Sequence, residues 1–207
     1  MWPQFYELVT TPPAAGRPIL PSGHAFYVLV EALGAHPDAD AARFEQVLTE
    51  VLEGALATDA VIAKSQAERD RMWALRDDVR QTARDGPIVA FDVSLPIPQM
   101  EAYLAEVRAA LTARWPQVVM TVFGHLGDGN LHVIVGVGDR EARHVIEEIV
   151  YGPLKAHGGS ISAEHGIGLQ KRAFLPTSRS PEELALMRTL KQALDPKAIL
   201  NPGKVLG

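Results

Sequence analysis

The chain has 207 residues, 47% of them hydrophobic, so it can form one large domain or two small ones. Its net charge is −5 with no long basic run, which argues against a nucleic-acid partner. It contains no cysteine, which excludes disulfides and thiolate metal ligands and favours a cytoplasmic location. We expect no membrane span, because no apolar run reaches about 18 residues, and no glycine-rich phosphate loop is present.

The first part of the chain predicts an entry segment followed by alternating strands and helices. Residues 1–22 contain five prolines and little periodicity, so we expect them to cross the surface of a domain that spans 23–207. Apolar runs predict strands, and apolar side chains at helical spacing predict helices. The expected elements are strand 26–30, helix 39–56, strand 59–63 and helix 67–84, the last with Ser65 as its N-cap.

The second part is more regular. Helix 100–115 has the clearest pattern, with apolar residues at Met100, Tyr103, Leu104, Val107 and Leu111. The other expected elements are strands 88–95, 118–123, 131–135 and 160–162, a helix from Asp139 that ends before Gly158-Gly159, and helix 181–194. This order predicts an α+β domain of ferredoxin-like type, with an antiparallel or mixed sheet and helices layered on one face.

The stretch Gly124–His132 (GHLGDGNLH) predicts a hairpin between two of these strands. If Asp128-Gly129 is a two-residue turn, His125 lies directly opposite His132. Their Cβ atoms would then be roughly 4.5–5.5 Å apart, close enough for both imidazoles to bind one metal ion. The alternative is a hairpin with two half-buried histidines and no ligand.

Glu164-His165, between an expected short strand and Gly166, is the second candidate. Glu164 would complete a His₂Glu ligand set with His125 and His132, of the kind that leaves a metal position open for substrate. His165 beside it is suited to act as a general base. Adjacent side chains on a strand point to opposite faces, so both can enter one pocket only if the strand has ended, as Gly166 suggests.

Two further polar residues lie among apolar neighbours. Arg76 is either an ordinary surface ion-pair residue or a bidentate clamp for a carboxylate. Asp92, on the alternating strand, is interpreted as a structural hydrogen-bonding residue.

Three motifs occur in a defined order: Gly124–His132, Glu164–Gly168 (EHGIG) and Asp195–Lys204 (DPKAILNPGK). Together they resemble the C-terminal cap domain of FAD-linked oxidases of the vanillyl-alcohol-oxidase superfamily. The most similar members are the D-lactate, glycolate-oxidase-subunit and D-2-hydroxyglutarate dehydrogenases. The resemblance implies a FAD-dependent oxidation of a D-2-hydroxy acid, with hydride transfer from the substrate to flavin.

The resemblance also implies roles for individual residues. His125, His132 and Glu164 would bind a divalent metal, often zinc, and His165 would remove the hydroxyl proton of the substrate. Arg76 would bind the substrate carboxylate, and Asn201 would lie near the flavin or the active site. The FAD-binding domain would be a partner outside these residues, and the docking face left exposed could support a homodimer.

Two positions depart from the hydroxyglutarate-type pattern. Ala90 stands where those relatives typically have lysine, and Ile134 where they tend to have asparagine. Both departures remove polar contacts, so a smaller or more apolar 2-hydroxy acid is expected. The alternatives to this function are a free-standing His₂Glu metal hydrolase and a non-catalytic interaction module.

Overall fold

The computed structural model describes residues 1–206, which form two compact units: residues 1–82, and the residues from 83 onward. The expected domain boundary after residue 22 is a different division, inside the first unit, and stays a prediction about the organisation of the domain.

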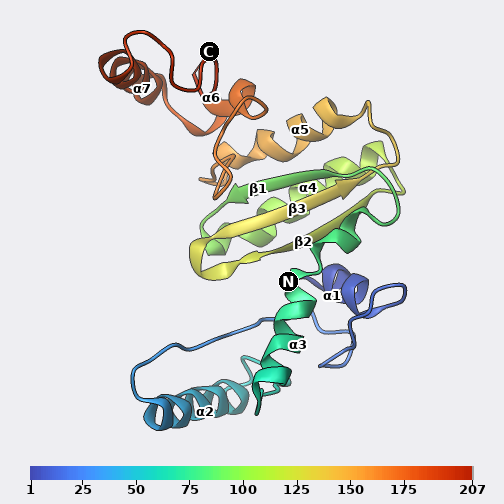
Figure 1. Ribbon diagram of the computed structural model, residues 1–207. Coiled ribbons are helices and arrows are strands. Elements are labelled where there is room, and N and C mark those ends of the chain that lie inside the picture. Colours follow the sequence, from blue (N-terminus) through green and yellow to red (C-terminus); the bar gives the residue numbers. More distant parts are fainter. Residues whose placement is uncertain (207) are drawn as a thin grey trace. The chain divides into compact units, whose positions relative to one another are not determined.

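The first unit is helical. Its helices are α1 (Pro3–Thr10), α2 (Pro37–Glu53) and α3 (Gln66–Asp77), and a 3-10 turn, Val79–Ala83, follows (Figure 1). Both expected helices are present, although the second ends at Asp77 and not at residue 84. The Ser65 side chain caps α3 by accepting a hydrogen bond from the Glu68 N–H. The expectation of little regular structure in residues 1–22 is wrong for α1, where Pro3 occupies the first turn and costs no hydrogen bond.

The strands expected at 26–30 and 59–63 are absent: both segments are irregular. Apolar and β-branched residues form a strand only where a neighbouring strand can pair with them. The first unit has no strand among its described residues, so these segments have no ladder to join. Tyr27, the second residue of the first run, instead stacks on Tyr6 of α1 with ring centroids 3.7 Å apart.

The second unit is α+β, as predicted. Strands β1 (Val89–Ser94), β2 (Val119–His125) and β3 (Asn130–Gly136) form an antiparallel sheet in the order β1-β3-β2 (Figure 1). The helices are α4 (Met100–Arg114), α5 (Arg143–Tyr151), α6 (Leu175–Ser178) and α7 (Pro181–Leu194). The 3-10 turns are Ile97–Gln99, Leu126–Asp128, Gly152–Lys155 and Arg172–Phe174. The strand expected at 160–162 is reduced to one antiparallel bridge, Ser160 to Ser94.

One face of this sheet is apolar and carries helices α4 and α5. Phe91, Val133 and Val122 lie side by side across the three strands and are buried. Phe91 meets Tyr151 of α5 edge to face at 5.1 Å, and Tyr103 of α4 donates a hydrogen bond to the Val150 carbonyl at 2.8 Å. The five apolar residues predicted to face inward on α4 are all buried. The opposite face is therefore available for polar side chains.

The hairpin has a longer turn than predicted. His125 pairs with Asn130, and His132 pairs with Phe123, so the predicted direct opposition of His125 and His132 is wrong. Four residues, 126–129, form the turn: a 3-10 segment closed by Gly129 at φ 64°. The register differs by two residues on one strand, and an even shift keeps both histidines on the same face. Leu126 lies in the turn and is half exposed.

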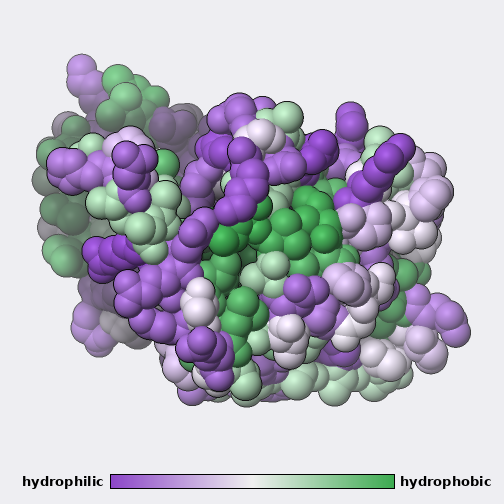
Figure 2. All heavy atoms as spheres, turned by 90° about the horizontal axis from the view of Figure 1, so that it is seen from below, coloured by the Kyte–Doolittle hydropathy of each residue, from purple (hydrophilic) through white to green (hydrophobic). Residues whose placement is uncertain are grey.

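Apolar side chains also occur at the surface of both units, and Figure 2 shows them between hydrophilic ones on the face that it presents. Helices α2 and α7 have no buried residue, although both carry leucines at helical spacing. Within residues 1–206, no helix combines the length and the apolar character needed to cross a membrane.

The hairpin register can be tested with two glycines of the same hairpin. A Cβ at Gly124 would lie 2.1 Å from the carbonyl oxygen of Asn130, whereas a Cβ at Gly127 would meet nothing within 4 Å. We expect Gly124→Ala to lower the free energy of unfolding by about 1–3 kcal/mol, because the two strands must move apart. Gly127→Ala is the control and should change it by less than about 1 kcal/mol. Urea denaturation measures both, and equal midpoints for the two variants would contradict this register.

Candidate metal and active site

The polar face of the sheet brings side chains from all three strands together. Asp92 of β1, His132 of β3 and Phe123 of β2 form one cross-strand row, and Ser94, Asn130 and His125 form the next. Because rows two residues apart share a face, His125 and His132 are diagonal neighbours. Their rings meet edge to face with centroids 5.8 Å apart.

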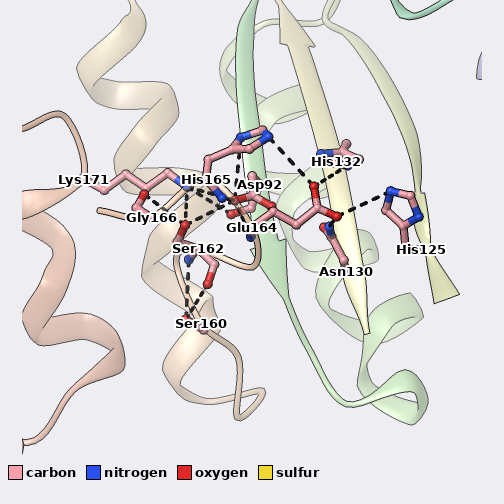
Figure 3. A network of polar contacts seen from close by, with 10 residues as sticks. All are labelled: Asp92, His125, Asn130, His132, Ser160, Ser162, Glu164, His165, Gly166 and Lys171. Carbon is pink, nitrogen blue, oxygen red and sulfur yellow. Dashed lines mark hydrogen bonds and ion pairs between the residues drawn. The ribbon is translucent and has the colours of Figure 1, made fainter. Parts of the chain in front are cut away.

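Glu164 reaches this face from the loop after Ser160 (Figure 3). Its Oε1 lies 3.4 Å from His125 Nε2, and its Oε2 lies 4.0 Å from His132 Nε2. One ligand atom from each of His125, His132 and Glu164 lies within 4.8 Å of the others. The three residues grouped from the sequence therefore lie side by side. The predicted reason for the approach of His125 and His132, direct opposition in the hairpin, was wrong.

Asn130 is a site residue that the sequence reasoning missed. It is 1% exposed, and its Nδ2 donates a hydrogen bond to Glu164 Oε1 at 2.6 Å. Its Oδ1 is buried without a partner among the described residues. An asparagine two positions before His132 on the same strand shares its face, and this alternation was the signal that could have identified it.

His165 lies beside the group without being part of it. Its Nε2 is 4.0 Å from Glu164 Oε2, and its ring is nearly parallel to that of His132 with centroids 5.9 Å apart. Its side chain is 65% exposed. Residues 163–168 have no regular secondary structure, so the alternation of a strand does not separate Glu164 from His165.

The surroundings set the protonation of two groups. Burial lowers the pKa of His132 and outweighs the opposing effect of Glu164 and Asp92, which favours the neutral imidazole that binds metals. Burial alone would raise the pKa of Asp92. The N–H groups of His165 and Glu164 and the charge of Lys171 together lower it instead, so this carboxyl group is ionised.

The two remaining predicted site residues are not part of this cluster. Arg76 belongs to the first unit, on α3, where its Nη1 lies 3.1 Å from Asp77 Oδ1. Asn201 is in the C-terminal tail of the second unit, with a backbone φ of 46°. The tail is bound to the loop that follows His165: Val205 N–H donates to the Gly168 carbonyl at 2.8 Å, and Arg172 donates to the Gly203 carbonyl at 2.6 Å. The roles of Arg76 and Asn201 stay predictions.

Comparison with known proteins identifies the class of this domain. Residues 12–205 match the family model described as "FAD linked oxidases, C-terminal domain", and the chain belongs to that family. It is thus a domain of an oxidoreductase family, as the three sequence motifs indicated.

The relatives that match include two named D-2-hydroxyglutarate dehydrogenases. The mitochondrial protein of Bos taurus is 40% identical over 184 residues, which cover 87% of this chain and 34% of the relative. The protein of Xanthomonas citri is 37% identical over 189 residues, covering 88% of this chain and 40% of the relative. A Schizosaccharomyces pombe protein, whose name assigns it provisionally to the mitochondrial D-lactate dehydrogenases, is 35% identical over 193 residues, covering 87% and 37%. The chain therefore spans little more than a third of the length of these relatives.

Proposed function

We propose that this chain is the metal- and substrate-binding domain of a FAD-dependent enzyme that oxidises a D-2-hydroxy acid. The observation that carries the proposal is the grouping of His125, His132 and Glu164 within 4.8 Å on one face of the sheet. Family membership supports the redox class, and the names of the relatives support a 2-hydroxy acid substrate.

The residues present fit a divalent metal ion. Two imidazoles and one carboxylate are a ligand set that zinc accepts while leaving a position open. The buried Oδ1 of Asn130, which has no partner among residues 1–206, supports the fit, because a water or a substrate group held at the site would supply its missing donor. A metal ion bound here would act as a Lewis acid on the oxygens of the substrate.

His165 is the proposed general base. It is exposed beside the ligand group, and its imidazole would take the hydroxyl proton of the substrate as the Cα hydrogen leaves as hydride, so that a 2-oxo acid forms. Arg76 would hold the substrate carboxylate in the orientation for this step. FAD supplies the hydride acceptor when it is bound.

A FAD-binding domain is the proposed partner. The relatives are much longer than the part that they share with this chain, and the chain carries no glycine-rich phosphate loop. Asn201 in the tail is the proposed flavin-facing residue. Exposed leucines on α7 are available for docking of that domain or for a homodimer.

Two apolar residues on the sheet face that carries the proposed metal site favour a substrate with a small or apolar side chain. Ala90 and Ile134, the two positions that depart from the hydroxyglutarate-type pattern, are directly paired across β1 and β3. Each lies two residues from a site residue, Asp92 or His132, and so on the same face. Ala90 is exposed and Ile134 is buried, so neither position offers a polar group that could pair with a second carboxylate.

Zinc affinity tests the proposed metal site. We expect the wild-type chain to bind one zinc ion, and His132→Ala to bind it at least about 100-fold more weakly, because a ligand is lost. His144→Ala is the matched control: His144 is exposed on α5, paired with Glu148, and its removal should leave the affinity unchanged. Isothermal titration calorimetry measures all three. Equal affinities for wild type and His132→Ala would contradict the proposal.

Substrate preference tests the exposed position, Ala90. The zinc-loaded wild-type chain should bind D-lactate more tightly than D-2-hydroxyglutarate. The variant Ala90→Lys should shift this ratio toward D-2-hydroxyglutarate by about tenfold, the effect of one new charge-assisted hydrogen bond. The control Ala90→Met enlarges the same side chain without a charge and should not shift the ratio. Ligand-observed NMR measures the affinities, and a wild-type preference for D-2-hydroxyglutarate would refute this substrate class.

A further inference from the structure

Glu164 and His165 need an external constraint to stay at the site. They lie in an irregular segment, and a free segment of this kind samples many backbone conformations. The nearest anchor before them is the bridge between Ser160 and Ser94 on β1. After them, the first backbone hydrogen bond to a distant segment joins Gly168 to Val205 of the C-terminal tail. Neither anchor fixes the peptide that joins Glu164 to His165.

Asp92 holds that peptide directly (Figure 3). Its Oδ2 accepts the N–H of His165 at 2.8 Å and the N–H of Glu164 at 3.0 Å. Because two successive N–H groups point at one carboxylate, the backbone between them can take few conformations. Asp92 is itself paired with His132 on β3. The same cross-strand row therefore contains the proposed metal ligand His132 and the residue that holds the loop with the proposed ligand Glu164.

Lys171 completes the arrangement. Its Nζ lies 3.4 Å from Asp92 Oδ2 and donates to the Asp92 carbonyl at 3.2 Å and to Ser162 Oγ at 2.9 Å. Ser162 Oγ in turn lies 3.2 Å from Asp92 Oδ2 and 3.0 Å from the Gly166 carbonyl, so its one proton can go to either. Asp92 is 2% exposed and the Lys171 side chain 13%, which means that each charge depends on the other.

We propose that Asp92 and Lys171 are positioning residues, which act through the Ser162–Gly166 loop to place Glu164 opposite His125 and His132. This inference rests on the proposed function, because it assigns to the buried pair the task of assembling that metal site. A role in folding alone is the alternative. If Asp92 positions the loop, its substitution weakens metal binding even in a variant whose stability is restored. If Asp92 acts only in folding, such a variant binds the metal as tightly as the wild type.

The test compares zinc affinity with stability in Asp92→Asn, Lys171→Met and the double variant D92N/K171M. Asparagine at 92 is neutral and keeps only one acceptor oxygen, whereas the carboxylate accepts the loop N–H groups with both oxygens and pairs with Lys171. We therefore expect about 10–100-fold weaker zinc binding with every metal ligand intact. Lys171→Met leaves the carboxylate without its counter-ion and should be destabilised. The double variant removes both charges and should unfold nearer to wild type, while its zinc affinity remains weakened. Lys197→Met, on an exposed lysine outside the network, is the control.

Two readouts separate positioning from folding. The visible spectrum of the cobalt(II)-substituted protein should change in D92N/K171M, since a displaced Glu164 alters the ligand field. Amide hydrogen exchange at Glu164 and His165 should accelerate in the metal-free variants relative to the strands. If Asp92→Asn alone fails to fold, zinc affinity and stability are compared in the double variant and in Lys171→Met.

The outcomes distinguish the two proposals. A folded D92N/K171M variant with wild-type zinc affinity and a wild-type cobalt spectrum would overturn the positioning role and leave the metal site standing. Wild-type protein that binds no zinc would refute the proposed function, and this inference with it.

Discussion

The carboxylate of Asp92 is the constraint on which the polar side of the second unit depends. A charged group that is 2% exposed needs hydrogen-bond donors inside the protein. For Asp92, backbone donors come from the Ser162–Gly166 loop, which follows the bridge between Ser160 and Ser94. The N–H groups of Glu164 and His165 serve this need. The same hydrogen bonds thus satisfy a buried charge and hold the loop that carries Glu164 of the proposed metal site.

The pairing of β2 with β3 is the second requirement, and the sequence predicted its main consequence. Strong β-propensity on both sides of Asp128-Gly129 identified the hairpin, and alternation placed the histidines on one face. The residue pattern does not determine the length of the turn, because both two-residue and four-residue turns accept glycine at the position of Gly129. The predicted register was wrong by two residues. Because two is even, His125 and His132 stay on one face of the sheet, but they are diagonal neighbours and not directly opposed.

Contacts between distant segments explain most of what the sequence did not reveal. Lys171 belongs to none of the three motifs, and the contacts of Asn130 and Lys171 form only when β1, β3 and the Ser162–Gly166 loop meet. Local patterns also failed where a strand needed a partner, as in residues 26–30. The amphipathic helix α4, in contrast, is determined by its own spacing and was predicted with all of its buried residues.

The central claim is that two histidines and a glutamate of this chain bind one metal ion together. Zinc K-edge X-ray absorption on the chain loaded with one equivalent of zinc tests it most directly, because imidazole ligands give a distinct multiple-scattering signature. The account predicts two imidazoles in the first coordination shell, with oxygen ligands completing it. A spectrum with oxygen ligands alone, or with a single imidazole, would contradict it.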